Sequence, residues 1–100
     1  MAVLTAERPR ARVAGADVSV DHFIGGRRVA SADTFEDHSP LDWSLLAEVS
    51  RGDAETAELA VGAAVDAFPA WAALGAAGRA VHLKRLADLI DANVERIAPV

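Results

Sequence analysis

The chain has 100 residues, a formal net charge of −5 at pH 7 and no cysteine. This length suits one small domain with a narrow margin of stability. The acidic balance argues against nucleic acid as a partner, because binding to phosphates requires a basic surface. The absence of cysteine excludes disulfides and cysteine-ligated metal sites.

The percentage of apolar residues in the chain overstates how large a hydrophobic core they can form. Hydrophobic residues make up 52% of the sequence, but 23 of them are alanine, which buries little area. The chain therefore forms either a lean helical unit or a part of something larger. No apolar run is long enough for a membrane-spanning helix, and no secretory signal is visible. We expect a cytoplasmic location, with organelle import as an alternative that Glu7 and Pro9 disfavour.

Residues 1–20 show no sustained hydrophobic period, and Pro9 and Gly15 interrupt them. We expect a flexible N-terminal arm that docks on another part of the protein or stays mobile. The folded portion is then expected to span residues 21–100.

Short strands are predicted from His22 onward. The pair Gly25-Gly26 separates two short apolar segments, which favours a tight hairpin because both glycines adopt positive φ at little cost. A phosphate-binding loop is disfavoured there, because no G-x-G-x-x-G or P-loop pattern surrounds the pair. Residues 34–38 and 45–49 are predicted as a second pair of strands, separated by Ser39-Pro40 and a turn.

Two helices are predicted in the second half of the chain. Asp53 is placed to cap the first helix. The apolar face of this helix is Ala60, Ala63, Ala64, Ala67, Phe68 and Trp71, and its alanines let another backbone approach closely. Pro69 predicts a bend or restart at Phe68. After Gly75, a second helix is expected from about Ala76 to the C-terminus. Its apolar stripe is Ala80, Leu83, Leu86, Ala87, Ile90, Val94 and Ile97.

Four segments follow one another in a recognisable order. They are HFIGGRRVAS from His22, TFEDHSPLD from Thr34, LLAEVSRGD from Leu45, and the helical AVGAAVDAFPAWAALGAAGRAVHLKRLADLI from Ala60. In series they resemble the N-terminal quarter or fifth of an aldehyde dehydrogenase, with an I-x-G hairpin, a T-F-x-x-x-[NS]-P segment, an A-V-x-A-A-x-x-A-F-x-x-W helix and an L-x-x-[IL]-A-D-L-I run. The residues at 34–40 and 53–90 also resemble those of semialdehyde dehydrogenases of aromatic-acid degradation.

The resemblance implies an α/β fold: two short β-strand pairs followed by two α-helices, packed on a Rossmann-type cofactor domain that is incomplete here. It implies a parent enzyme that oxidises an aldehyde or semialdehyde to a carboxylic acid with NAD or NADP, through a cysteine nucleophile and a glutamate base. Such enzymes are homo-oligomers. Their catalytic cysteine and glutamate, oxyanion asparagine and cofactor-binding lysine have no counterpart in this chain, so no catalytic, cofactor-binding or metal-binding residue is assigned.

The remaining polar patterns favour structural roles. His22, His38 and His82 lack metal-ligand spacing. The run Asp37-His38-Ser39 contains triad residue types, but neighbours in a strand point to opposite faces. For Arg79 we favour a structural ion pair over an anion site.

Two hypotheses follow from these patterns. In the first, the chain is the N-terminal part of an aldehyde dehydrogenase, cut at Val100 and inactive alone. In the second, it is a non-catalytic interaction module or split-enzyme subunit that docks on a partner through its helical faces.

Overall fold

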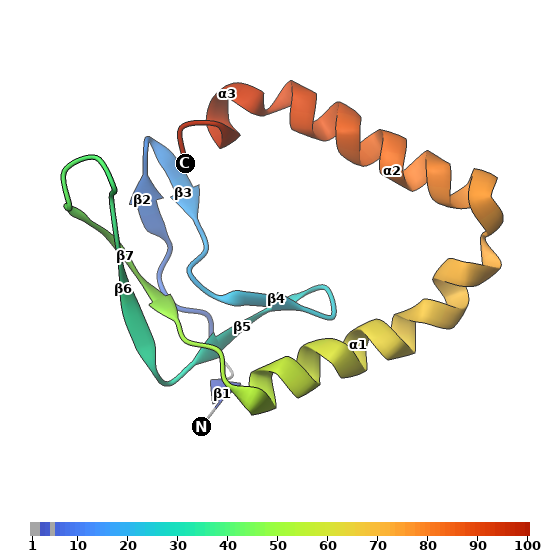
Figure 1. Ribbon diagram of the computed structural model, residues 1–100, viewed down its shortest axis with the longest axis horizontal. Helices are drawn as coiled ribbons and strands as arrows, with labels where there is room; N and C mark the ends of the chain where they lie inside the picture. The colour runs from blue at the N-terminus through green and yellow to red at the C-terminus, as the bar shows by residue number, and fades with distance from the viewer. Residues whose placement is uncertain (1–2, 5) are drawn as a thin grey trace.

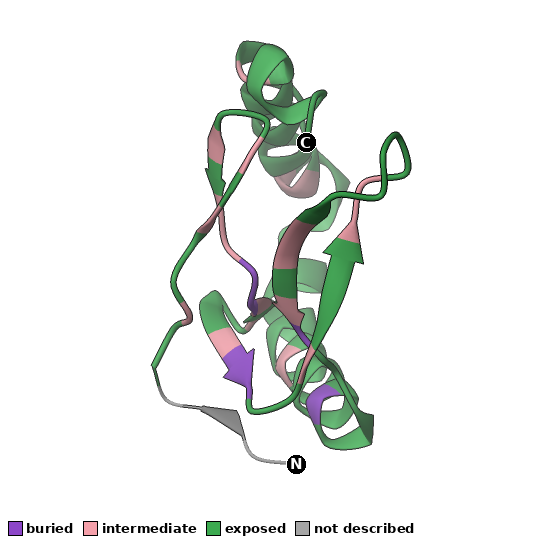
Figure 2. Cartoon of the chain, turned by 90° about the vertical axis from the view of Figure 1, so that its left-hand side faces the viewer, coloured by how far each residue is buried: buried purple, intermediate pink, exposed green. Residues whose placement is uncertain are grey.

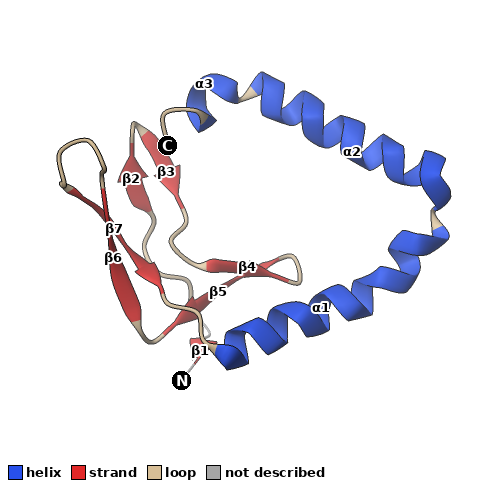
Figure 3. Cartoon of the chain, viewed as in Figure 1, coloured by secondary structure: helices blue, strands red, loops and turns tan. Residues whose placement is uncertain are grey.

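The computed structural model describes residues 3–4 and 6–100. Within these residues, seven strands precede three helices: β1 (Val3–Leu4), β2 (Ala11–Val13), β3 (Ala16–Val18), β4 (His22–Ile24), β5 (Arg27–Ser31), β6 (Thr34–His38), β7 (Leu45–Ser50), α1 (Ala54–Ala73), α2 (Gly75–Ala92) and α3 (Val94–Ile97). The strands gather at one side, and α1 and α2 form an arch that leaves them beside β1 and returns beside β3 (Figure 1). Figure 3 shows the same separation of strands from helices.

The two predicted strand pairs are confirmed. β4 pairs antiparallel with β5, and His22 lies opposite Val29 in the register. Gly25 and Gly26 have φ of 59° and 77°, as a two-residue hairpin turn requires. β6 pairs antiparallel with β7, with a register shift at Asp37/His38 just before the connecting loop. The packing of these elements on a Rossmann-type domain stays a prediction.

Regular structure begins earlier in the chain than the sequence pattern indicates. β2 and β3 form a third antiparallel hairpin, and β1 adds to the free edge of β5. Ala14 and Gly15 turn this hairpin with φ of 48° and 80°. The strands are two or three residues long, too short for an alternating pattern to stand out. The flexibility of the arm and the boundary after residue 20 stay predictions.

Helix α1 begins as predicted at Asp53, whose carboxylate accepts a hydrogen bond from the Thr56 amide at 2.9 Å. The helix continues through Pro69 to Ala73, so a restart at Phe68 is wrong, whereas a bend there stays a prediction. The real break is seven residues later, at Gly75, where φ is 69° and the axes of α1 and α2 meet at 116°. A side chain at Gly78 would place its Cβ 3.0 Å from that of Leu74, so glycine suits this tight corner.

The predicted helix from Ala76 to the C-terminus is interrupted near its end. α2 starts at Gly75 and ends at Ala92, and the single turn α3 follows Asn93. The Asn93 side-chain amide donates to the Leu89 carbonyl at 2.8 Å, and its backbone leaves helical geometry with φ −117° and ψ 11°. An asparagine side chain that competes for backbone hydrogen bonds commonly ends a helix.

Very little of the chain is buried. Among residues 6–100, Val20 and Ala30 are the buried apolar residues, and the buried polar ones are Asp21, Ser31, Ser50 and Thr56. These positions lie where the strand pairs meet and at the start of α1, and the helices are otherwise almost wholly exposed (Figure 2). The apolar stripes have the predicted helical spacing, but the chain itself does not cover them.

The dimensions of the molecule agree with this picture. Its accessible surface is 7427 Å², whereas a folded monomer of this mass exposes about 5,400 Å². Its radius of gyration is 16.4 Å, against about 13 Å for a compact domain of this length. The excess of about 2,000 Å² is comparable to the area that a large, stable protein interface buries.

Among the described residues, no single helix has the length and apolar content to cross a membrane. The pair α1 and α2 meets that criterion only when taken together, and it is sharply bent.

Candidate functional site

A buried polar network holds the three hairpins together. Ser50 donates its hydroxyl to Asp21 Oδ1 at 2.9 Å and accepts the backbone amide of Ser31 at 3.1 Å. The second carboxylate oxygen of Asp21 accepts the Arg8 amide at 2.9 Å, and the Arg8 guanidinium donates to the Ser31 carbonyl. These bonds join residues from β5, β7 and the segments that flank β2 and β3. Among the described residues the network pairs its buried polar groups, apart from Arg8 Nε, which has no hydrogen-bond partner, and its role is structural.

A serine–histidine contact adjoins this network, and the sequence analysis did not identify it. His22 Nε2 lies 2.9 Å from Ser31 Oγ. The two-residue turn at Gly25-Gly26 sets a register in which His22 faces Val29, which brings Ser31 into diagonal reach. Ser31 has no exposed surface, and its neighbour Asp21 contacts Ser50 instead of the imidazole. A substrate therefore cannot reach the hydroxyl, and the pair is not a nucleophilic dyad.

The residues Asp37, His38 and Ser39 do not assemble into a triad. The His38 ring stacks on Trp43, with 5.0 Å between centroids and 10° between planes, and its Nε2 lies 3.4 Å from Glu36 Oε2. Ser39 Oγ accepts the Leu41 amide at 3.2 Å within the loop between β6 and β7. His38 thus orders the tip of a hairpin.

The third histidine and Arg79 also have structural neighbours. His82 packs against Trp71 across the α1–α2 corner, with 5.8 Å between ring centroids. Arg79 donates to the Ala72 carbonyl at 3.2 Å and so satisfies the end of α1. The acidic partner predicted for Arg79 is absent from its contacts among the described residues. Across the described residues 3–4 and 6–100, no three histidine, aspartate or glutamate side chains lie close enough together to hold a metal ion.

The turn at Gly25-Gly26 does not have the geometry of a dinucleotide-binding loop. Gly25 and Gly26 turn between two antiparallel strands, whereas a phosphate cradle opens onto the N-terminus of a helix. The Gly25-Gly26 turn is therefore not a phosphate cradle, and the absence of cofactor-binding residues from this chain stays a prediction.

Two exposed carboxylates have perturbed acidity. Hydrogen bonds from the Ser44 hydroxyl, and then from its amide, lower the pKa of Asp42 below its ordinary value. The backbone amide of Thr56, assisted by its hydroxyl, lowers the pKa of Asp53. Both carboxylates are stabilised in the charged form by local turn and cap geometry, which is a structural role.

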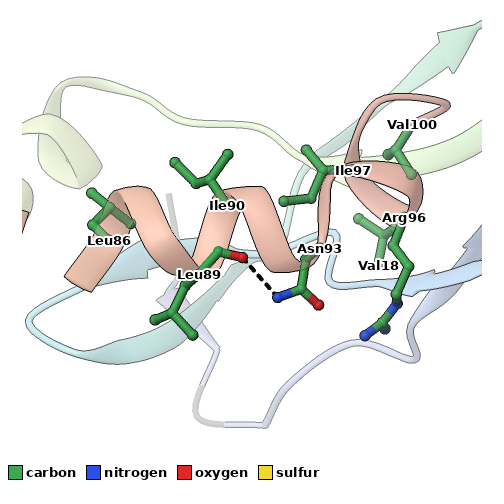
Figure 4. A pocket seen from close by; sticks show the side chains of 8 residues that line it. All are labelled: Val18, Leu86, Leu89, Ile90, Asn93, Arg96, Ile97 and Val100. Atoms are coloured by element: carbon green, nitrogen blue, oxygen red, sulfur yellow. Dashed lines mark hydrogen bonds between the residues drawn. The ribbon is translucent and has the colours of Figure 1, made fainter. Parts of the chain in front are cut away.

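The most prominent surface features are apolar. Figure 4 shows a groove where Val18 of β3 faces the last turns of α2 and the α3 region. Its α2–α3 wall contains Leu86, Leu89, Ile90 and Ile97, each about half exposed. A second groove lies between the β4–β5 hairpin and α1. Such surfaces on a small chain are typical of regions that another polypeptide covers.

Comparison with known proteins identifies the family of this chain. The aldehyde dehydrogenase family model matches residues 28–100. No solved structure gives a significant match.

Individual relatives are similar over most of this chain. The 5-carboxymethyl-2-hydroxymuconate semialdehyde dehydrogenase of Escherichia coli is 43% identical over 79 residues, which is 79% of this chain and 17% of that protein. A probable aldehyde dehydrogenase of Streptomyces coelicolor is 40% identical over 80 residues, or 78% of this chain and 16% of that protein. Vanillin dehydrogenase of a Pseudomonas species is 43% identical over 70 residues, or 68% of this chain and 15% of that protein.

The chain thus spans about a sixth of the length of the curated relatives that it matches. The family model covers well over half of the chain, including most of β5, the β6–β7 pair and both long helices. The chain belongs to the aldehyde dehydrogenase family.

Proposed function

We propose that this chain is the N-terminal part of an NAD(P)-dependent aldehyde dehydrogenase that oxidises an aldehyde or semialdehyde to a carboxylic acid. The observation that carries the proposal is the 43% identity to a semialdehyde dehydrogenase over most of this chain. The substrate class follows that relative's name, and a cytoplasmic homo-oligomer is part of the same proposal.

Within such an enzyme, these residues act as scaffold. Family members use a cysteine nucleophile, and this sequence contains no cysteine. The buried polar network of Asp21, Ser31 and Ser50 fixes the three hairpins, and the hairpins and Asp53 fix where α1 starts. The helices then present apolar faces that are exposed in this chain and would be buried against the cofactor domain.

The experiment compares the chain alone with a full-length chimera. In the chimera, this chain replaces the matching segment of the Escherichia coli semialdehyde dehydrogenase. Formation of reduced nicotinamide is measured with that enzyme's own semialdehyde substrate and with simple aldehydes. We expect no turnover from the 100-residue chain and measurable turnover from the chimera.

The two alternatives predict different results. Turnover by the 100-residue chain would refute the scaffold role. A chimera that folds and assembles but oxidises no aldehyde would favour the non-catalytic interaction module. The large exposed surface of this chain, which matches only 16 to 17% of the length of its relatives, also supports that alternative.

A further inference from the structure

The groove between the β4–β5 hairpin and α1 has an apolar floor. Ile24 and Val29 contribute from the hairpin, and Leu59 and Ala63 contribute from the helix. The hairpin turn closes one end, where a Cβ on Gly25 would lie 3.7 Å from that of Ala63. Leu59 is 45% exposed, so the floor is open to a further segment.

The walls of this groove are strongly acidic. On α1, Glu55, Glu58 and Asp66 share the face of Leu59 and Ala63, because they recur at helical spacing. Arg27 on the hairpin is the cation among the lining residues. Glu55 has an interaction of its own, which leaves the carboxylates of Glu58 and Asp66 to set the charge of the groove. Glu58 and Asp66 have no hydrogen bond or ion pair with any residue that the structure describes.

Charge and apolar surface together restrict what covers the groove. A segment that buries Leu59 also removes water from the neighbouring carboxylates, and a desolvated carboxylate without a cation is costly. An apolar segment alone, or an acidic one, is therefore disfavoured. A segment with apolar side chains flanked by lysine or arginine matches both features.

We propose that this groove receives a basic-flanked apolar segment from the remaining five-sixths of the aldehyde dehydrogenase polypeptide, with its cations paired to Glu58 and Asp66. The proposal rests on the proposed function, since it requires that the rest of such an enzyme docks here. It adds the docking place on α1 and the charge of the occupant.

The absence of cysteine from the chain permits a direct test. Gly62 lines the groove, and a Cβ there would meet no atom within 4 Å, so Gly62→Cys introduces a thiol without a clash. Asp88→Cys places a control thiol on the exposed surface of α2, outside both grooves. The probe is the Escherichia coli relative from which the matching N-terminal segment has been deleted, and its own thiols are blocked beforehand with a maleimide.

Maleimide labelling is measured with and without this probe, after binding is quantified by analytical ultracentrifugation. We expect labelling at position 62 to slow by about tenfold or more in the complex, while labelling at position 88 stays within about twofold, because a covered thiol reacts only when the segment opens. Binding with unchanged labelling at position 62 would overturn the groove proposal and leave the proposed function standing. Absence of binding at 50 µM of each polypeptide would overturn both.

A second arm tests the charge of the occupant. The double variant Glu58→Gln/Asp66→Asn removes both unpartnered carboxylates, and Asp88→Asn/Asp91→Asn is the matched control on α2. We expect the first to weaken binding of the probe by about tenfold at low salt, with a smaller difference at about 0.5 M NaCl, and the control to change it less than about twofold. Equal or tighter binding by Glu58→Gln/Asp66→Asn would contradict a cationic occupant.

Discussion

Ser50 and Asp21 lie 29 residues apart in the sequence and share a hydrogen bond of 2.9 Å between buried side chains. The bond connects the end of β7 to the residue that precedes β4. The Ser50 amide reinforces this connection by donating to the Val20 carbonyl at 2.9 Å. Because Ser50 is also the partner of the Ser31 amide, one hydroxyl fixes the relative position of three strands.

Replacing this hydroxyl should loosen the junction locally. In Ser50→Ala, the buried Ser31 amide loses its acceptor, and leaving such a donor unpaired costs about 1–3 kcal/mol. We expect hydrogen exchange of the Ser31 amide to accelerate by about 5- to 150-fold, measured by NMR. Ser44→Ala, in the exposed loop between β6 and β7, is the matched control and should leave this amide unchanged. An unchanged rate in Ser50→Ala would show that the hydroxyl is not the acceptor.

The cap of α1 should respond to acid. Hydrogen bonding from Thr56 lowers the pKa of Asp53 in the folded chain, relative to 3.8 in the unfolded one. The contribution of this carboxylate is therefore fully present above pH 3.8 and is lost as the pH falls through the lowered folded value. We expect the Thr56 amide resonance to follow this titration in NMR spectra.

Asparagine separates the charge of the cap from its hydrogen bond. Asp53→Asn keeps a side-chain oxygen for the Thr56 amide but does not titrate, so the Thr56 resonance should lose its acid transition while α1 stays capped. Asp53→Ala should fray the first turn at every pH. A Thr56 titration that persists in Asp53→Asn would assign the effect to another carboxylate.

The sequence predicted the local elements well where residue type constrains the backbone. The adjacent glycines at 25 and 26 predicted the β4–β5 hairpin, and Asp53 predicted the start of α1. Pro69 misled the prediction of a restart, because the helix continues through it despite the loss of one intrahelical hydrogen bond. Gly75 marked the true break, since its positive φ is incompatible with continuing the helix.

The buried network was not predictable in the same way. Asp21 and Ser50 are ordinary loop and strand-end residues in the sequence, and their pairing depends on how the hairpins pack. Likewise, the apolar stripe of α2 was predicted from its helical spacing, but spacing does not tell whether the chain itself covers the stripe. The exposed fractions of Leu83 and Leu86, 57% and 54%, show that it does not.

This exposure predicts an unusual response to polar substitution. Leu83→Gln should change the free energy of unfolding of the 100-residue chain by less than about 0.5 kcal/mol, because the side chain is largely solvated already. Val20→Asn, at a buried position, should cost about 1–3 kcal/mol by burying an amide. Urea denaturation followed by circular dichroism measures both. The same Leu83→Gln change in the full-length chimera should cost more than in the isolated chain; an equal, small cost in both would mean that the α2 stripe stays exposed in the enzyme.

The junction between α2 and α3 should be removable by one substitution. Asn93 ends α2 through its side-chain bond to the Leu89 carbonyl, and α3 starts at the next residue. Alanine cannot make that bond and has the highest helix propensity, so Asn93→Ala should join the two segments into one helix through Ile97. We expect a stronger helical signal in circular dichroism and slower exchange of the amides of residues 94–97. Asn93→Asp is the control. Its carboxylate, like alanine, cannot donate to the Leu89 carbonyl, but aspartate has a lower helix propensity than alanine. If Asn93→Ala leaves the helical signal unchanged, the side-chain bond is not what separates α2 from α3.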